Sequence, residues 1–435
     1  MTSITAKRLA MRLNELTATE IVSAIAGGKT TCEAVTRACL DHIAAREPQV
    51  QAWQYLNPEQ VIAQARALDK SGRRGPLLGV PFGIKDIIDS CDMPTEYGSP
   101  IYRNHQPKSD AACVALSRKA GGILMGKTVT TEFANLTPGK TRNPFDLART
   151  PGGSSSGSAA AVGDYHVPLA IGTQTTGSTI RPASFCGAFA YRPTYADLRC
   201  SGVREVAGSL DTLGLIARSI EDMALYRDVL LGIEPKPLPA EGGVPRIGFC
   251  RTHLWPILEP YTQRLLDGAV EKLARAGAKM VDVTLPPEFE RVEDAHRWIS
   301  SFEFVRNFTW EIENHWEQIG ERVREGRIKD GLSCSFERYI ESRSFAEKCR
   351  AMFSDVFGDC DVLLAASVVG EAPVGLHSTG NVRPSAIWTT MHAPVVTLPV
   401  FKGPNGLPVG AQLIARRNDD RWLFAAARWV YRQLV

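Results

Sequence analysis

The chain contains 435 residues, of which 44% are hydrophobic, so it can bury a large core as one elaborated domain or as two closely packed ones. Its 50 basic and 47 acidic residues leave a formal net charge of +3, and no long basic stripe stands out, which argues against nucleic acid as a direct ligand. No apolar run approaches the roughly 20 residues that span a bilayer, and residues 1–10 lack the apolar segment of a secretory signal, so we expect neither a membrane protein nor a secreted one.

The N-terminal part, at 15–70, predicts helices. Thr17-Ala-Thr-Glu20 and Thr30-Thr-Cys-Glu33 both have the capping-box form of a helix start, in which a threonine and a glutamate bond each other's backbone N–H groups. The pair Gly27-Gly28 separates these two helices, and a third helix is expected near 57–70.

From about 78 to 233, short apolar strands alternate with helices, and we assign this segment as the catalytic core. Residues 110–120 predict an amphipathic helix that ends at Gly121-Gly122 and is followed by an apolar run. Residues 121–128 also match GxxxxGK[ST], the pattern of phosphate-binding loops. That loop needs a strand before it and a helix after it, and its interior must not be an apolar strand. We therefore reject nucleotide binding.

Residues 234–245 contain four prolines and predict a linker. Residues 246–435 then mix strands and helices, and the alternation of the two along the chain favours an α/β sandwich. The mainly helical segment 286–355 is rich in aromatic residues, which either pack the helices together or form a lid over a substrate cleft; we favour packing. The remaining expected elements are a strand at 246–250, a helix at about 260–277, and strands at 279–284, 361–365 and 395–400.

Three short motifs indicate the chemistry. Segments 149–162 and 172–184 each contain a turn rich in Gly, Ser and Thr that opens a small-residue segment, so backbone N–H groups and hydroxyls converge there as in an anion-binding nest or an oxyanion hole. Upstream, Lys85 ends an apolar run, where burial would lower its pKa. A lysine followed by two serine turns suggests acyl transfer without histidine.

A flexible linker is the alternative interpretation of the first turn. Linkers of this composition are flanked by polar sequence, whereas this run passes into Ala159-Ala-Ala-Val162 and then into the apolar segment 166–172. That order predicts a tightly packed helix followed by a buried strand, so we reject the linker.

On these motifs the chain resembles the amidase-signature family of amide hydrolases. The family's lysine motif, its serine-rich turn and its nucleophile turn occur here in order, with Lys85 preceding Ser154 by 69 residues and Ser154 preceding Ser178 by 24. The resemblance covers roughly residues 15 to 430, and it implies an α/β fold with a large twisted mixed sheet and helices on both faces, taken here as a single domain over 1–435. Further matches are Gly126-Lys-Thr128, Glu132-Phe133, Arg142-Asn-Pro144, Pro193-Thr194 and 406–414.

The resemblance implies a role for each motif residue. Ser178 is similar to the family's nucleophile, which forms an acyl-enzyme, and Ser154 to a bridging serine held by a cis peptide bond to Gly153. Lys85 is similar to the base that accepts the proton of the nucleophile through the bridging serine. A serine hydroxyl needs such a base, and a lysine can supply it near neutral pH only when its pKa is strongly lowered. The resemblance implies no metal and no cofactor, and it implies an oxyanion hole from the backbone N–H groups of Thr175, Thr176 and Gly177.

Two positions depart from the usual family pattern. Thr176 stands where most relatives have glycine, so either this position is extended or the oxyanion turn is altered, because a β-branched residue avoids positive φ. Arg181 lies three residues after Ser178, which resembles malonamidase-type members in which the arginine binds a substrate carboxylate. A structural arginine that ties the loop to a carboxylate elsewhere is the other interpretation, and both stay open.

Cysteines and histidines give no sign of a metal site. The ten cysteines form no CxxC pair, which in a chain of this length indicates free thiols in a reducing cytoplasm. The eight histidines include no HExxH motif and no carboxylate–histidine cluster at ligand spacing. His392 alone lies in a segment similar to the family's substrate-facing region, and we expect it to be a hydrogen-bonded packing residue.

The sequence thus predicts a cytoplasmic, metal-independent amidase that acts on linear carbon–nitrogen bonds other than peptide bonds, in a small carboxylated amide. Two alternatives remain: the amidase component of a tRNA-dependent amidotransferase, which would need a partner chain, and a weakly active binding homologue. We expect a small-molecule amide as the partner, no direct nucleic-acid or membrane partner, and leave a homodimer open.

Overall fold

The computed structural model describes residues 12–72, 74–239 and 243–435. Residues 1–11, on which the expectation of no secretory signal rests, and 240–242 of the expected linker lie outside the described residues. Eleven described strands form one sheet in the order β1-β3-β2-β4-β6-β5-β10-β11-β9-β7-β8. The strands are β1 (Trp53–Leu56), β2 (Pro81–Lys85), β3 (Ile123–Thr128), β4 (Leu169–Gln174), β5 (Phe189–Arg192), β6 (Thr212–Ala217), β7 (Arg246–Cys250), β8 (Lys279–Val283), β9 (Val362–Ala366), β10 (Val395–Lys402) and β11 (Pro408–Ile414).

The sheet is mixed. Strand β2 runs parallel to β3 and β4, β7 runs parallel to β8 and β9, and the other pairs are antiparallel. The helices are α1 (Ala18–Ala26), α2 (Cys32–Val50), α3 (Pro58–Ser71), α4 (Ala112–Lys119), α5 (Ser156–Gly163), α6 (Ile180–Phe185), α7 (Ile220–Leu231), α8 (Pro260–Arg275), α9 (Val292–Asn307), α10 (Thr309–Asn314), α11 (Glu321–Val323), the π-helical turn η7 (Arg324–Ile328), α12 (Lys329–Ser333), α13 (Phe336–Val356), α14 (Arg383–Thr390) and α15 (Asp420–Leu434). The expected α/β fold with a mixed sheet is confirmed.

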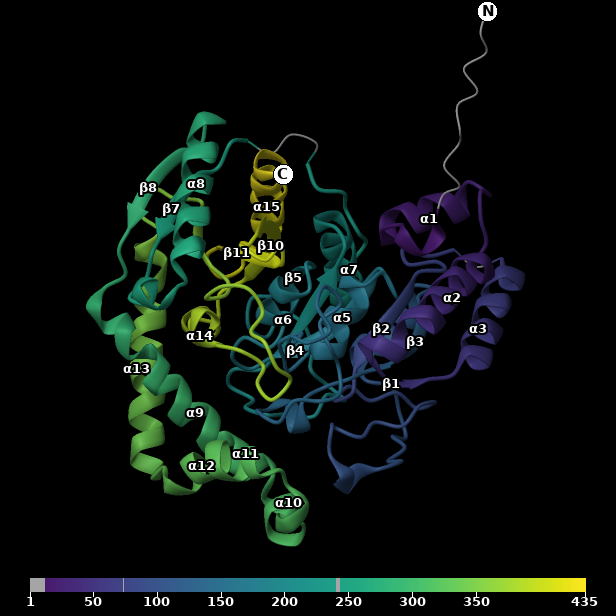
Figure 1. Cartoon of the computed structure of the whole chain (residues 1–435), viewed down its shortest axis with the longest axis horizontal. Coiled ribbons are helices and arrows are strands. Elements are labelled where there is room, and N and C mark those ends of the chain that lie inside the picture. The colour runs from purple at the N-terminus through teal and green to yellow at the C-terminus, as the bar shows by residue number, and fades with distance from the viewer. Residues whose placement is uncertain (1–11, 73, 240–242) are drawn as a thin grey trace, which may run out of the picture.

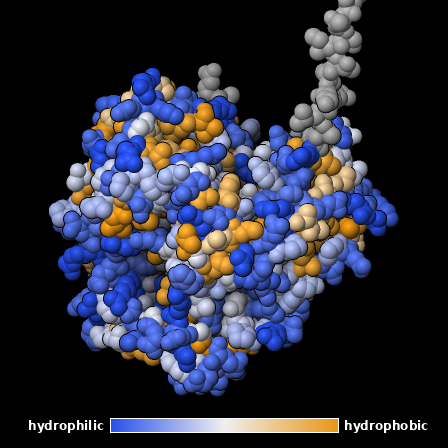
Figure 2. Space-filling model, in the orientation of Figure 1, coloured by the Kyte–Doolittle hydropathy of each residue, from blue (hydrophilic) through white to orange (hydrophobic). Residues whose placement is uncertain are grey.

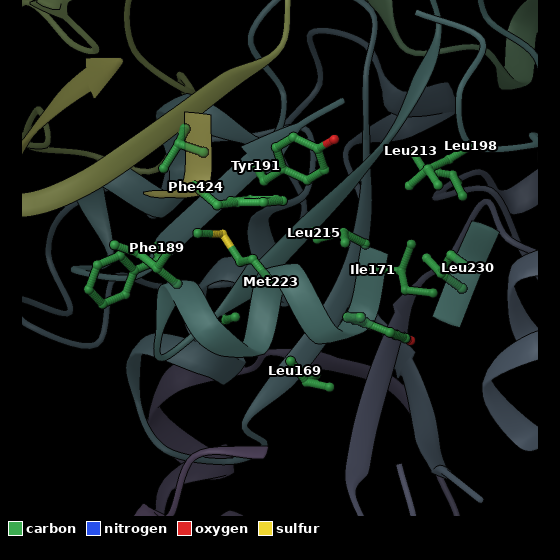
Figure 3. Packing of buried hydrophobic residues seen from close by; sticks show 14 of the residues in the cluster. Leu169, Ile171, Phe189, Tyr191, Leu198, Leu213, Leu215, Met223, Leu230 and Phe424 are labelled. Carbon is green, nitrogen blue, oxygen red and sulfur yellow. The ribbon is translucent and has the colours of Figure 1, made fainter. Parts of the chain in front are cut away.

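Helices cover both faces of the sheet, because alternate side chains of each strand enter different cores. In β4, Leu169 and Ile171 enter one core and Ala170 enters the other. Figure 3 shows the first core, where Met223 of α7 and Phe424 of α15 lie among the side chains of β4, β5 and β6. The second core contains side chains of α2, α3, α5, α6, α13 and α14. The small residues of α5 place this helix close against the sheet.

The expected helix start at Thr17 is confirmed, and the one expected at Thr30 lies one residue later. Thr17 forms a complete capping box with Glu20. At the second site the N-cap is Thr31 rather than Thr30, and its side chain accepts a hydrogen bond from the N–H of Ala34. The prediction was wrong by one residue because Glu33 does not fold back on the cap: its carboxylate lies 2.7 Å from Arg37.

Helices α9 to α13 extend away from the sheet at the lower left of Figure 1. Phe304 and Phe308 of this segment are buried and stacked with ring centroids 4.3 Å apart, which supports the packing interpretation of its aromatic residues. Trp310 stays 54% exposed.

Figure 2 shows mostly hydrophilic residues on this face of the molecule, with apolar residues in separate patches, so this face singles out no dimer surface. Among the described residues, no helix has the length and apolar content to cross a membrane.

The sheet brings the motif residues to one edge. Lys85 is the last residue of β2, and the nucleophile turn starts directly after Gln174, the last residue of β4. Because β2 and β4 are parallel neighbours, their carboxyl ends lie side by side, which is where ligands bind in open α/β sheets. Helix α5 begins just after the serine turn and delivers Ser154 to the same place.

Candidate active site

Lys85 is completely buried at the end of β2. Its Nζ lies 2.6 Å from Ser154 Oγ and 2.8 Å from Thr173 Oγ1. Burial lowers the pKa of Lys85 to about 7, and the negative charge of Asp211 opposes this shift. Near neutral pH the amine therefore loses its proton readily, and its lone pair can then accept a proton from the Ser154 hydroxyl.

The serine turn holds several hydroxyls, but only Ser154 reaches the lysine. The peptide bond between Gly153 and Ser154 is cis, as the resemblance implied. The other hydroxyls are tied to backbone: Ser155 Oγ lies 3.3 Å from the carbonyl oxygen of Thr173, Ser156 Oγ lies 3.2 Å from that of Val129, and Ser158 Oγ lies 3.3 Å from that of Ile171. A single serine of this run is thus placed for proton transfer.

Gly157 explains how closely this helix approaches the sheet. A Cβ at this position would lie 2.2 Å from the carbonyl oxygen of Ala52 and 2.3 Å from the backbone nitrogen of Val129. Only glycine fits there without displacing backbone, so the Gly/Ser composition of the turn reflects close packing rather than flexibility.

Ser178 belongs to a turn whose carbonyl groups are fixed and whose N–H groups are free. Its four carbonyl oxygens accept hydrogen bonds, that of Thr175 from His296 Nε2, that of Thr176 from Thr389 Oγ1, that of Gly177 from the N–H of Arg181, and that of Ser178 from the N–H of Ser155. No described group accepts a hydrogen bond from the N–H groups of residues 175–178. Fixed donors without partners are what an oxyanion hole requires.

Thr176 fits this turn without positive φ. Neither Thr176 nor Gly177 is among the described residues with positive φ, so the β-branched side chain brings no backbone strain. Gly177 is required for a different reason, because a Cβ there would lie 2.8 Å from Ser385 Cβ on α14 and from Val382 Cγ2. The departure at Thr176 therefore brings no positive φ into this turn, which weakens the main sequence argument for a weakly active homologue.

Ser178, 8% exposed, lines a pocket of about 370 Å³. The pocket walls come from the turns after β3 and β4, from the 378–382 loop and from the segment 322–327 beside α11 and η7. A larger hollow of about 470 Å³ lies elsewhere and is not lined by Lys85, Ser154 or Ser178, so size alone would point to the wrong place.

Arg181 also lines this pocket, and it is buried without a counter-ion. Its Nη1 donates to the carbonyl oxygen of Gly380 at 2.7 Å, and its Nη2 donates to that of Gly153 at 2.6 Å. Its Nε is buried with no partner, and burial lowers the pKa of the guanidinium to about 9. The structural interpretation from the sequence is thus wrong about the partner, since Arg181 ties the loop to carbonyls and not to a carboxylate. Its charge remains uncompensated inside the pocket wall.

The sequence analysis did not identify two further residues that line the pocket, Arg327 and Asn135. The side chain of Arg327 in η7 makes no hydrogen bond to another described residue, its Nη1 atom is buried without a partner, and burial lowers the pKa of the guanidinium to about 10. Asn135 is 8% exposed, and neither polar atom of its side chain has a partner. Nothing in the local sequence marks either residue, because their lack of partners appears only in the folded chain.

Two histidines near the site, His296 and His392, make structural contacts. His296 on α9 is buried and donates its Nε2–H to the Thr175 carbonyl at 2.8 Å, and burial lowers its pKa to about 4, so it is neutral. Sequence analysis missed this contact. His392 stacks on Tyr195 with ring centroids 4.0 Å apart and bonds the carbonyl of Ser209, which confirms it as a packing residue.

Two groups of potential metal ligands occur among the described residues, and neither lines this pocket. In the first, Asp164 is held by Arg46 at 2.8 Å, and His166 accepts a hydrogen bond from Trp53 at Nδ1, so its Nε2 carries the proton that faces Asp164. The second group consists of Cys91, Asp92 and Asp110, whose carboxylates pair with Arg118. Metal-independent hydrolysis stays a prediction.

The comparisons with known proteins agree with this geometry. A family model described as Amidase matches residues 34–424. A glutamyl-tRNA(Gln) amidotransferase subunit from Chloroflexus aggregans is 34% identical over 94% of this chain and 95% of that relative. A solved amidase structure has a TM-score of 0.88 at 27% identity, covering 97% of this chain and 100% of that one. The peptide amidase of Stenotrophomonas maltophilia has a TM-score of 0.83 at 26% identity over 97% of each chain.

The fold, the serine and lysine motifs and these matches over nearly the whole length lead to one conclusion. The chain belongs to the amidase-signature family, whose members hydrolyse carbon–nitrogen bonds.

Proposed function

We propose that this protein hydrolyses the amide bond of a small carboxylated molecule through Ser178, Ser154 and Lys85. The observation that carries the proposal is the arrangement of Lys85 Nζ at 2.6 Å from Ser154 Oγ, beside a turn with four free N–H groups, in a pocket lined by a guanidinium without a counter-ion. We keep metal-free chemistry, a single domain and a cytoplasmic location as parts of the proposal. The ten free thiols support that location.

In this mechanism Ser178 Oγ attacks the amide carbon while its proton passes through Ser154 to neutral Lys85. The developing oxyanion binds the N–H groups of Thr175, Thr176 and Gly177, an effect worth about 2.7–4 kcal/mol per donor. The same path returns the proton to the leaving nitrogen. Water then attacks the acyl-enzyme, activated by the same base, and releases the carboxylic acid.

Two guanidiniums of the pocket, that of buried Arg181 and that of half-buried Arg327, support the substrate class. Arg181 and Arg327 line the pocket that contains Ser178, and neither forms an ion pair with a described carboxylate. An unpaired buried charge is costly, and an anionic ligand would remove that cost while gaining charge-assisted hydrogen bonds. The malonamidase-type resemblance at Arg181 points to the same class.

A second candidate is the glutamine-hydrolysing component of a tRNA-dependent amidotransferase. The curated relatives favour it, since one chain of such an enzyme is 34% identical over 94% of this chain. Glutamine is also a carboxylated amide, so the two candidates share the cationic pocket. They differ in whether the chain recognises an α-ammonium group and needs a partner chain.

A substrate panel with the purified chain tests both candidates. We expect hydrolysis of a short monoamide that carries a distal carboxylate, with kcat/KM about ten- to a hundredfold above its neutral methyl analogue, since one charge-assisted contact contributes about 1.5–3 kcal/mol. Preference for glutamine would select the second candidate. Equal rates on charged and neutral amides would contradict the proposed substrate class.

The pH dependence should report on Lys85. Because burial lowers its pKa to about 7, the amine is protonated and inactive below that pH, and kcat/KM should rise through about pH 7 and level off above it. Neutral His296, with its pKa near 4, adds no second step in this range. Stopped assays across the range measure the profile, and dialysis against a chelator should leave it unchanged. A rate restored only by added metal would overturn the mechanism.

A further inference from the structure

Asp211 is a carboxylate that the mechanism above does not use. It precedes strand β6, and both of its oxygens are held: Oδ1 accepts from Thr175 Oγ1 at 2.5 Å, and Oδ2 accepts from the N–H groups of Val206 and Ala207 at 2.7 and 3.0 Å. This side chain thus joins the turn that carries the free N–H groups to the turn that leads into the neighbouring strand.

Asp211 also lies on the lysine side of β4. Thr173 lies in β4, and Thr175 is the first residue after the strand ends. The first accepts a hydrogen bond from Lys85 at 2.8 Å and the second donates to Asp211 at 2.5 Å. Thr173 and Asp211 also line one small cavity of about 80 Å³. The carboxylate thus shares this cavity with Thr173, the residue that Lys85 contacts, and its negative charge acts on the pKa of Lys85.

We propose that Asp211 is a positioning residue for hydrolysis, which aligns the oxyanion turn through the Thr175 hydroxyl and holds a negative charge beside Lys85. The proposal rests on the proposed function in one respect, namely that Ser178 and Lys85 act as nucleophile and base. It does not depend on which amide is the substrate.

The charge of Asp211 has a defined effect on the lysine. Burial raises the pKa of Asp211 to about 6, below the value of about 7 for Lys85, so the carboxylate is mostly ionised at the pH where Lys85 loses its proton. Removing this charge would lower the pKa of Lys85 further and move the acid limb of the rate profile to lower pH. The other titratable groups that interact with Asp211 are Cys200, Glu205, Tyr195 and Arg327, and they stay the same in the variants below.

Acylation of Ser178 by 4-nitrophenyl acetate tests this without an amide substrate. The burst rate is measured across pH, and the acetylated peptide is identified by mass spectrometry. We expect Asp211→Asn to lower the plateau rate about tenfold and to move the acid limb down by about one pH unit. Thr175→Val should lower the plateau similarly and move the limb less than Asp211→Asn does, because the carboxylate remains, although losing the Thr175 hydrogen bond raises its pKa. Asp355→Asn, on exposed α13, is the matched control and should behave like the wild type.

Asp211→Glu separates the effect of the carboxylate's charge from that of its position. The acid limb of the acylation rate should stay where it is in the wild type, while the plateau rate should fall. This variant and Thr175→Val also carry the test if Asp211→Asn does not fold, which thermal melting reveals. An unmoved limb in folded Asp211→Asn, or a limb in Thr175→Val that moves as far as in Asp211→Asn, would overturn the proposal. Wild type that is not acetylated at Ser178 would instead refute the nucleophile and this inference with it, whereas loss of the preference for carboxylated amides would leave the inference standing.

Discussion

Replacing Ser178 by alanine is expected to abolish hydrolysis, with a loss of about 10⁴-fold or more in kcat, because the variant lacks the hydroxyl proposed to attack the amide carbon. Ser154→Ala and Lys85→Met should each lose about 10²–10⁴-fold, since either change interrupts the proton path. The three groups act as one unit, so a double variant should lose little more than the worse single one.

Ser156→Ala is the matched control for these variants. It removes a hydroxyl from the same turn, but one that is bonded to the Val129 carbonyl and not to the lysine. Steady-state assays with the best substrate of the panel, together with thermal melting, measure all variants. Near-normal turnover by Ser178→Ala would make the nucleophile assignment wrong.

The second large effect concerns substrate charge. Arg327→Ala should lower kcat/KM for a carboxylated amide by about ten- to a hundredfold and leave the neutral analogue nearly unchanged, because this guanidinium has no hydrogen bond to lose within the described part of the protein. Arg181→Ala should impair both substrates, since it also releases the carbonyls of Gly153 and Gly380, and should impair the carboxylated one more.

Comparing the two substrates within each variant isolates the charge effect from loop damage. Arg322→Ala, which alters an exposed pocket arginine, gauges the contribution of long-range charge alone. If Arg327→Ala reduced both substrates equally, its role would be to support the η7 segment, and the anionic substrate class would lose its main support.

Much of the architecture could be predicted from the sequence because its determinants are local. The Thr17 capping box, the helix near 57–70 and the β-α-β unit around α8 depend on neighbouring residues and are confirmed, the last with bounds at Pro260–Arg275. Strand β11 was not predicted as a strand, although residues 406–414 match the family pattern. The one-residue error at Thr31 has a distant component besides the pairing of Glu33 with Arg37, because Asp69 accepts hydrogen bonds from the N–H groups of Cys32 and Glu33.

The site was predictable in part for the same reason. The motifs place Lys85 and Ser154 at the end of a strand and the start of a helix, and their 2.6 Å contact follows from the sheet. The groups that hold the oxyanion turn could not be predicted, since His296 and Thr389 lie 121 and 213 residues from the carbonyls they bind. No periodicity or spacing encodes such pairs.

The two carbonyl contacts of His296 and Thr389 also bear on when activity can arise during synthesis. The three proposed reacting residues, Lys85, Ser154 and Ser178, all precede residue 233. A nascent or proteolytic fragment that ends there therefore contains all of them. It lacks both side chains that hold the carbonyls of Thr175 and Thr176. The N-terminal half should therefore be inactive on the ribosome. It should gain activity only when the C-terminal half packs against it, either as part of the same chain or as a separately expressed fragment.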